Sequence, residues 1–81
     1  MLEKLQHENK VIGMKQVARS VREGVGVQQI YLAQDADSHM INKIYELAEE
    51  NHIEIVSVES RKKLGKFCGI DVGATVVAVL K

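Results

Sequence analysis

A basic helix face has the clearest chemistry in this sequence. Lys15, Arg19 and Arg22 fall at i, i+4 and i+7, opposite the apolar residues of the same segment. The segment begins at residues 13–16, where free backbone N–H groups and the positive end of the helix dipole favour phosphate. Lysine and arginine can also donate to guanine O6 and N7, and an amide such as Gln16 can read base edges. The pattern therefore indicates a helix that binds nucleic acid.

Charge is segregated along the chain, although the formal net charge is zero. Residues 10–22 and residues 61–66 each hold four basic and no acidic residues, whereas residues 23–60 hold eight acidic residues and one lysine. Such asymmetry favours a surface that binds a polyanion. Two solvated helix faces that happen to be basic are the alternative interpretation. With three aromatic residues in all, the chain is poorly supplied for stacking single strands, which favours a folded RNA.

Residues suited to catalysis or metal binding are sparse. His7, His39 and His52 have no partner at metal-ligand spacing, so we expect no metal site and no cofactor. Cys68 falls on the apolar side of a short helix, where a free cysteine behaves as a small hydrophobe. A catalytic role for Cys68 and Asp71 needs a third, activating group that the sequence does not supply. The expectation is a protein without enzymatic activity.

Length and composition set the broad class of the protein. The chain has 81 residues, of which 46% are hydrophobic, and this predicts one domain over residues 1–81. No apolar run reaches 18 residues, so we expect no membrane span. The acidic residues near the N-terminus do not suit a signal peptide, and the single cysteine suits a reducing compartment. We therefore expect a cytoplasmic protein, and the absence of heptads favours a monomer.

Helix and strand patterns alternate along the chain, which predicts an α/β fold. The expected architecture is a three-layer α/β/α sandwich with a mixed, about four-stranded central sheet. The predicted elements are a weak helical start at residues 2–8, an extended piece at 10–12, a helix from Met14 to Gly24, a strand from Val27 to Ala33, a helix from Asp37 or Ser38 to Asn51, a strand from Ile53 to Val58, a short helix capped by Ser60 that ends at Gly69, and a strand from Ala74 to Leu80.

Two of these elements have a specific burial pattern. The last strand is almost continuously apolar, as expected of a strand buried on both faces. The helix before Asn51 has an apolar stripe at helical spacing, while its glutamates face solvent. The predicted buried stripe comprises Met40, Ile41, Ile44, Tyr45 and Ala48.

Three segments carry a resemblance to a known family. They are residues 11–17 (VIGMKQV), 32–37 (LAQDAD) and 58–74 (VESRKKLGKFCGIDVGA). The run Leu-Gly-Lys-x-Cys-Gly-Ile at 64–70 is the most specific part. The chain resembles, over nearly its whole length, the kink-turn RNA-binding ribosomal-protein superfamily, and its small bacterial members most of all. The resemblance implies the α/β/α sandwich and binding to kink-turns, which are RNA helices bent sharply at tandem sheared G·A pairs beside a short bulge.

The resemblance also implies roles for individual positions. Gly13 allows close backbone approach, Lys15 and Gln16 face guanine edges, and Arg19 faces phosphate or a base edge. Many archaeal members have Asn-Glu in place of Lys15-Gln16, so the preferred kink-turn is expected to differ. The loop at residues 58–60 covers a flipped-out nucleotide and is followed by basic side chains. The predicted RNA-binding residues are Gly13, Met14, Lys15, Gln16, Arg19, Val58, Glu59, Ser60, Arg61, Lys62 and Lys63.

The expected partner is a structured RNA that contains a kink-turn, in ribosomal RNA or a riboswitch, which makes the ribosome a candidate partner. A protein-interaction adaptor of the same fold is the alternative, because the superfamily also contains adaptors that bind proteins. Such an adaptor would use the acidic helix at residues 37–51 rather than the basic segments.

Overall fold

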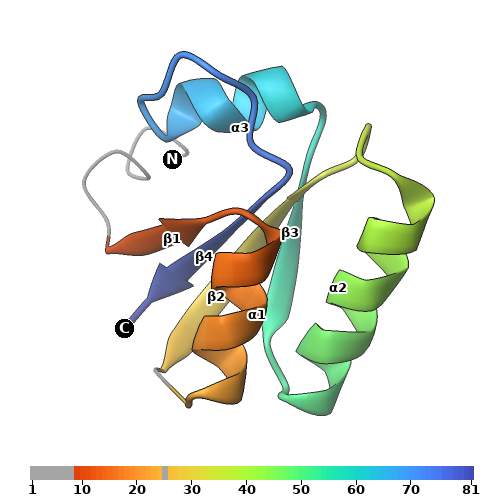
Figure 1. Ribbon diagram of the computed structural model, residues 1–81, viewed down its shortest axis with the longest axis vertical. Helices are drawn as coiled ribbons and strands as arrows, with labels where there is room; N and C mark the ends of the chain where they lie inside the picture. Colours follow the sequence, from red (N-terminus) through yellow and green to blue (C-terminus); the bar gives the residue numbers. More distant parts are fainter. Residues whose placement is uncertain (1–8, 25) are drawn as a thin grey trace.

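Strands and helices alternate strictly in the computed structural model, which describes residues 9–24 and 26–81 (Figure 1). The predicted helical start at residues 2–8 lies outside the described residues. The elements are β1 (Lys10–Ile12), α1 (Met14–Arg22), β2 (Val27–Ala33), α2 (Ser38–Glu50), β3 (Glu54–Val58), α3 (Arg61–Phe67) and β4 (Val76–Leu80).

The strands form one mixed four-stranded sheet in the order β1-β4-β2-β3. The last strand, β4, lies between β1 and β2 and is antiparallel to both, whereas β2 and β3 are parallel. As a result β1, β2 and β3 all run in the same direction. Their C-terminal ends therefore lie at the same end of the sheet as the start of β4. We call this end of the sheet the loop edge, because the connections that precede the three helices (residue 13, residues 34–37 and residues 59–60) begin there.

Both faces of the sheet are covered by helices, which confirms the predicted α/β/α sandwich. Val76 and Ala78 of β4 pack in one buried cluster with residues of α1 and α2. Val77 and Val79, the alternate residues of the same strand, pack in a second cluster with residues of α3. The prediction that the last strand is buried on both faces is therefore confirmed. The helices α1 and α2 cover one face of the sheet, and α3 covers the other (Figure 1).

Local polar contacts fix where the helices begin and end. Asp37 caps α2 by accepting from the His39 N–H at 2.8 Å, and Ser60 caps α3 by accepting from the Lys63 N–H at 3.1 Å. Both caps were predicted. The strand β4 begins two residues later than predicted, because the Ala74 N–H donates to the Arg61 carbonyl and so belongs to a loop held against α3.

The predicted buried stripe of α2 is wrong at Tyr45. Ile44 and Ala48 are fully buried, but Tyr45 is 44% exposed, and Leu47 packs at the margin of the core instead. The centre of the stripe lies between Ile44 and Ala48. At 100° per residue, Tyr45 and Leu47 lie about 80° to either side of that centre, so both are flanking positions.

The burial of α2 predicts that truncating two neighbouring side chains lowers the stability of the protein by unequal amounts. Ile44→Ala should lower the free energy of unfolding by about 2–5 kcal/mol, since it leaves a cavity between α2 and the sheet. Tyr45→Ala should cost far less, because much of that side chain already faces water. Urea unfolding followed by circular dichroism measures both values. Equal losses would contradict this orientation of α2.

Candidate nucleic-acid interface

Backbone hydrogen bonds join the strand ends at the loop edge into one frame. The Gly13 N–H donates to the Val76 carbonyl at 2.9 Å, and the Ala33 N–H donates to the Thr75 carbonyl at 2.9 Å. These bonds attach the ends of β1 and β2 to the start of β4. Neighbouring strands lie about 4.8 Å apart, so three spacings put the ends of β1 and β3 about 14 Å from each other. The loops after these strands therefore form one continuous surface.

The start of α1 leaves its backbone donors uncovered. Gly13 is the N-cap and has φ 104° and ψ 150°, a conformation that strains any residue with a Cβ. It has no side chain with which to cap the helix, and no acidic residue lies in the first turn. The first N–H groups of an α-helix have no partner within the helix. Apart from its two chain neighbours, no atom of the described residues lies within 4 Å of where a Gly13 Cβ would be, so this part of the chain leaves room for an external acceptor to approach these groups. Met14 is half-buried and packs against the core below them.

The basic face of α1 divides between the two ends of the helix. Lys15 and Gln16 are exposed in the first turn, at the loop edge. Arg19 follows one turn later and makes an exposed ion pair with Glu23, in which Nε and Oε2 are 3.5 Å apart. Arg22 ends the helix, about 10 Å along the axis from Lys15. Arg22 therefore lies away from the loop edge, although its spacing in the sequence grouped it with Lys15.

The loop between β3 and α3 mixes buried and exposed residues. The side chain of Val58 is buried in the core, so this predicted RNA-binding residue has no side-chain surface at the loop edge. Its carbonyl accepts from the Gln34 N–H at 2.8 Å. Glu59 is exposed and accepts from Lys63 Nζ at 2.7 Å. This hydrogen bond and the positive charge of Lys63 hold the pKa of the Glu59 carboxyl below its usual value.

Basic side chains from both faces of the sheet surround the loop edge in two classes. Arg19, Arg61 and Lys63 each have a carboxylate partner within 3.5 Å. The exposed residues Lys15, Lys62 and Lys66 have no carboxylate partner within the described part of the chain. Exposed pairs of this kind stabilise a protein only weakly. Cations of both classes are therefore available to bind an anionic partner.

The loop between α3 and β4 also reaches the loop edge and is not among the predicted RNA-binding segments. A Cβ on Gly65 would overlap the Val72 carbonyl oxygen, so the loop lies directly against α3. The Ala74 N–H donates to the Arg61 carbonyl at 3.0 Å and holds the other end of the loop. Val72 is 70% exposed, although its own carbonyl makes the first of these attachments. The only signal in the sequence is one apolar residue between the turn residues Asp71 and Gly73.

No catalytic or metal-binding group is evident in the described residues. Cys68 is buried, and desolvation raises the pKa of its thiol, which disfavours the nucleophilic thiolate. Groups of three or more histidine, cysteine, aspartate or glutamate side chains placed to hold a metal do not occur over residues 9–24 and 26–81. Within the same ranges, no helix is long and apolar enough to cross a membrane.

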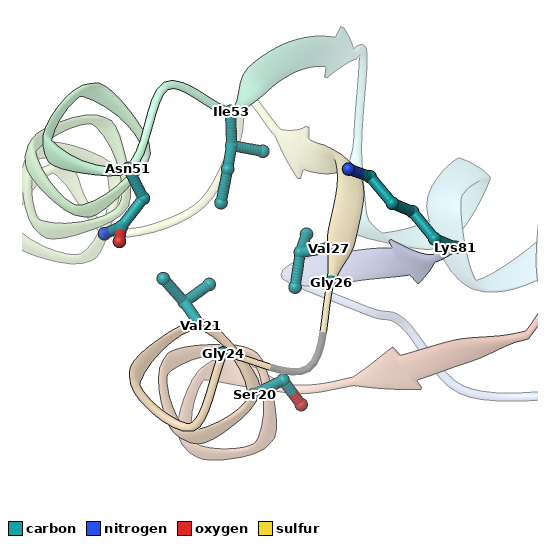
Figure 2. Close-up of a pocket in the computed structure, with 8 residues that line it drawn as sticks. All are labelled: Ser20, Val21, Gly24, Gly26, Val27, Asn51, Ile53 and Lys81. Atoms are coloured by element: carbon teal, nitrogen blue, oxygen red, sulfur yellow. The ribbon is translucent and has the colours of Figure 1, made fainter.

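A separate hollow of about 260 Å³ lies at the opposite end of the sheet from the loop edge (Figure 2). Val21 and Gly24 line it at the end of α1, and Ile53 lies near the start of β3. The C-terminal ends of α1 and α2 lie beside this hollow and carry the negative ends of the helix dipoles. None of the predicted RNA-binding residues lines it, so the hollow is distinct from the loop edge.

The fold and this edge define a class of small α/β/α proteins with basic loops at one end of a mixed sheet. All 81 residues match the model of the ribosomal protein L7Ae/L30e/S12e/Gadd45 family, and the chain belongs to that family. The resemblance found in the sequence is thereby confirmed.

Curated relatives and solved structures agree with this assignment. The RNA-binding protein YbxF of Geobacillus stearothermophilus is 44% identical over 77 residues, which cover 95% of this chain and 93% of YbxF. An RNA-binding protein of Caldanaerobacter subterraneus is 45% identical over 85% of this chain and 83% of its own length. A Bacillus halodurans protein with unknown function superposes with a TM-score of 0.90 at 25% identity, covering 99% of this chain and 83% of that one. The 15.5kD RNA binding protein of Giardia lamblia shares the fold, with a TM-score of 0.86 at 21% identity over 99% of this chain and 70% of its own.

The close packing of the α3–β4 loop against α3 predicts a specific sensitivity at Gly65. Gly65→Ala should lower the free energy of unfolding by about 1–3 kcal/mol, because the new methyl group must displace the Val72 backbone. Urea unfolding measures the change, with Lys66→Ala as the control on the exposed side of the same helix. An unchanged midpoint in Gly65→Ala would show that the loop is not held there.

Proposed function

We propose that this protein recognises kink-turns in structured RNA, as a monomer without enzymatic activity, and that its target lies in ribosomal RNA or a riboswitch. One observation carries the proposal: the uncapped start of α1 and the basic start of α3 lie at the same edge of the sheet. The family is one of ribosomal proteins, and the curated relatives are named RNA-binding proteins, which supports an RNA partner.

On the α1 side, the proposed contacts read guanine. Sheared G·A pairs widen the groove and leave guanine edges open to a helix end. Lys15 Nζ donates to guanine O6 and N7, while the Gln16 amide oxygen accepts from guanine N–H groups. Gly13 lets the backbone N–H groups of the first turn come close to the RNA, since it has no side chain and the described residues leave the space beside it open.

On the α3 side, the proposed contacts are with the phosphate backbone of the bent RNA and with its flipped-out base. Arg61 and Lys62 are exposed at the start of α3 and face phosphates. Glu59 and Ser60 lie in the loop before them. Val72 adds an exposed apolar surface beside Arg61, against which an unstacked base can pack.

The acidic face of α2 is the observation that favours a second candidate function. Glu46, Glu49 and Glu50 are exposed there and have no cation partner in the part of the chain that the structure describes. Their charge repels RNA from this face and leaves it to a protein partner. An adaptor role on α2 is therefore the alternative if RNA binding fails.

Base reading by α1 predicts losses that depend on the RNA. Lys15→Ala and Gln16→Ala should each weaken binding to a kink-turn by about 1–3 kcal/mol, the usual value of a specific base contact. Binding to a plain duplex should change little. Gel-shift titrations with both RNAs measure the difference, and Arg22→Ala is the control, since it removes a charge from the far end of α1. Equal losses on both RNAs would contradict base reading.

Phosphate contacts at α3 predict a change in salt dependence. Lys62→Ala should reduce the slope of log K against log salt by about 0.9 if the side chain neutralises one phosphate of a duplex. Lys43→Ala, on the acidic helix α2, should leave the slope unchanged. Titrations at several potassium chloride concentrations give both slopes. A wild-type slope in Lys62→Ala would exclude the proposed phosphate contact.

A further inference from the structure

A carboxylate in the turn between β2 and α2 makes two contacts with the first residue of α3. Asp35 Oδ1 accepts from the Arg61 backbone N–H at 2.8 Å, and the same oxygen lies 3.5 Å from Arg61 Nε. The two residues are 26 positions apart in the sequence. Figure 1 shows the turn that contains Asp35 beside the start of α3. Asp35 therefore joins two of the loops that meet at the loop edge.

Arg61 is held from three directions at this point. Asp35 accepts from its backbone N–H, while its carbonyl accepts from the Ala74 N–H at 3.0 Å. A Cβ on Gly73 would lie 3.2 Å from Arg61 Cβ, so the loop before β4 closes the third side. With the backbone held in place, the remaining conformational freedom of Arg61 lies in the rotamers of its side chain. Asp35 restricts these rotamers as well, since its Oδ1 lies 3.5 Å from Arg61 Nε.

Capping accounts for only one of the two contacts of Asp35. Ser60 Oγ accepts from the Lys63 N–H, and Asp35 accepts from the Arg61 N–H, which is another of the first-turn donors without a partner in the helix. The approach of the same carboxylate oxygen to Arg61 Nε caps nothing and concerns the side chain alone. A carboxylate beside a surface that binds phosphate repels the partner and so opposes binding. An arginine side chain, in turn, loses much rotamer freedom when a partner orders it. A contact that orders Arg61 in the free protein lowers this cost on binding, and such preorganisation can outweigh the repulsion.

We propose that Asp35 is a positioning residue for RNA recognition, which holds the Arg61 guanidinium at the loop edge in the direction of the bound phosphates. The inference rests on the proposed function. Asp35 does not touch the RNA in this arrangement. Its effect on affinity passes through Arg61, which distinguishes it from the cations themselves and from Asp37, the other acidic residue of the same turn.

A double-mutant cycle on the intact protein tests the proposal, with gel-shift titrations against a kink-turn RNA. Asp35→Ala should weaken binding by about 3- to 10-fold, within the range of coupling between residues in contact. In the Arg61→Ala background, the same substitution should cost less than about two-fold, because the side chain that it positions is gone. Losses that multiply in the double variant would overturn the proposal, and so would tighter binding by Asp35→Ala.

Two further variants separate geometry from charge. Asp35→Asn keeps an oxygen that can accept from the Arg61 N–H, so it should bind within about two-fold of the wild type. Asp37→Asn is the matched control for charge, since it removes the same charge from the same turn, keeps a side chain that can cap α2 and does not contact Arg61. It should not weaken binding. If Asp35→Asn loses as much as Asp35→Ala, or if Asp37→Asn weakens binding equally, the positioning role is wrong.

A measurement without RNA keeps the inference separate from the proposed function. In ¹H–¹⁵N spectra of the free protein, the Arg61 backbone amide and Nε–H signals should shift in Asp35→Ala and stay near their wild-type positions in Asp37→Asn. Unchanged Arg61 signals in Asp35→Ala would overturn the positioning role whatever the RNA result. If the wild type does not bind the kink-turn but the signals shift as expected, the contact stands and the proposed function fails.

Discussion

The pairing of β4 between β1 and β2 is the constraint on which the rest of the structure depends. Because β4 is antiparallel to both neighbours and β3 is parallel to β2, the strands β1, β2 and β3 run in one direction and end at one edge. Hydrogen bonds from the Gly13 N–H to the Val76 carbonyl and from the Ala33 N–H to the Thr75 carbonyl fix where the loops after β1 and β2 leave the sheet. The apolar residues of β4 make this position favourable, since a strand buried on both faces belongs in the middle of a sandwich. Three helix starts are thereby brought to one side of a small domain.

The charge pattern of the sequence becomes a spatial pattern through the same constraint. The starts of α1 and α3 are free of acidic residues and meet at the loop edge from opposite faces of the sheet. The acidic residues of α2 face solvent elsewhere, and the ends of α1 and α2 point to the far edge. The loop edge is therefore more favourable for a polyanion than the acidic face of α2 is. Under the proposed function, this asymmetry directs the RNA to the loop edge before any base is read.

Much of the fold could be predicted from the sequence, because its signals are local. Helical spacing, capping residues and β-branched runs depend on neighbours within a few positions, and the helices and strands predicted from residue 10 onward were confirmed with small shifts at their ends. The errors and omissions concern contacts between distant segments. Arg22 shares a helix face with Lys15, but which of the two lies at the loop edge depends on how the strands pair. For Val72 the sequence holds only a weak signal, one apolar residue between two turn residues. The contact between Asp35 and Arg61 spans 26 positions and depends on how two loops meet, so only the folded chain reveals it.

The central claim is that the loop edge binds a particular bent RNA rather than nucleic acid in general. The most direct test is a gel-shift titration against a standard kink-turn RNA, beside the same helix with its tandem G·A pairs replaced by Watson–Crick pairs. The account predicts tight binding to the kink-turn and much weaker binding to the straightened helix. Equal, weak binding to both RNAs would contradict it and would reduce the loop edge to a generic basic surface.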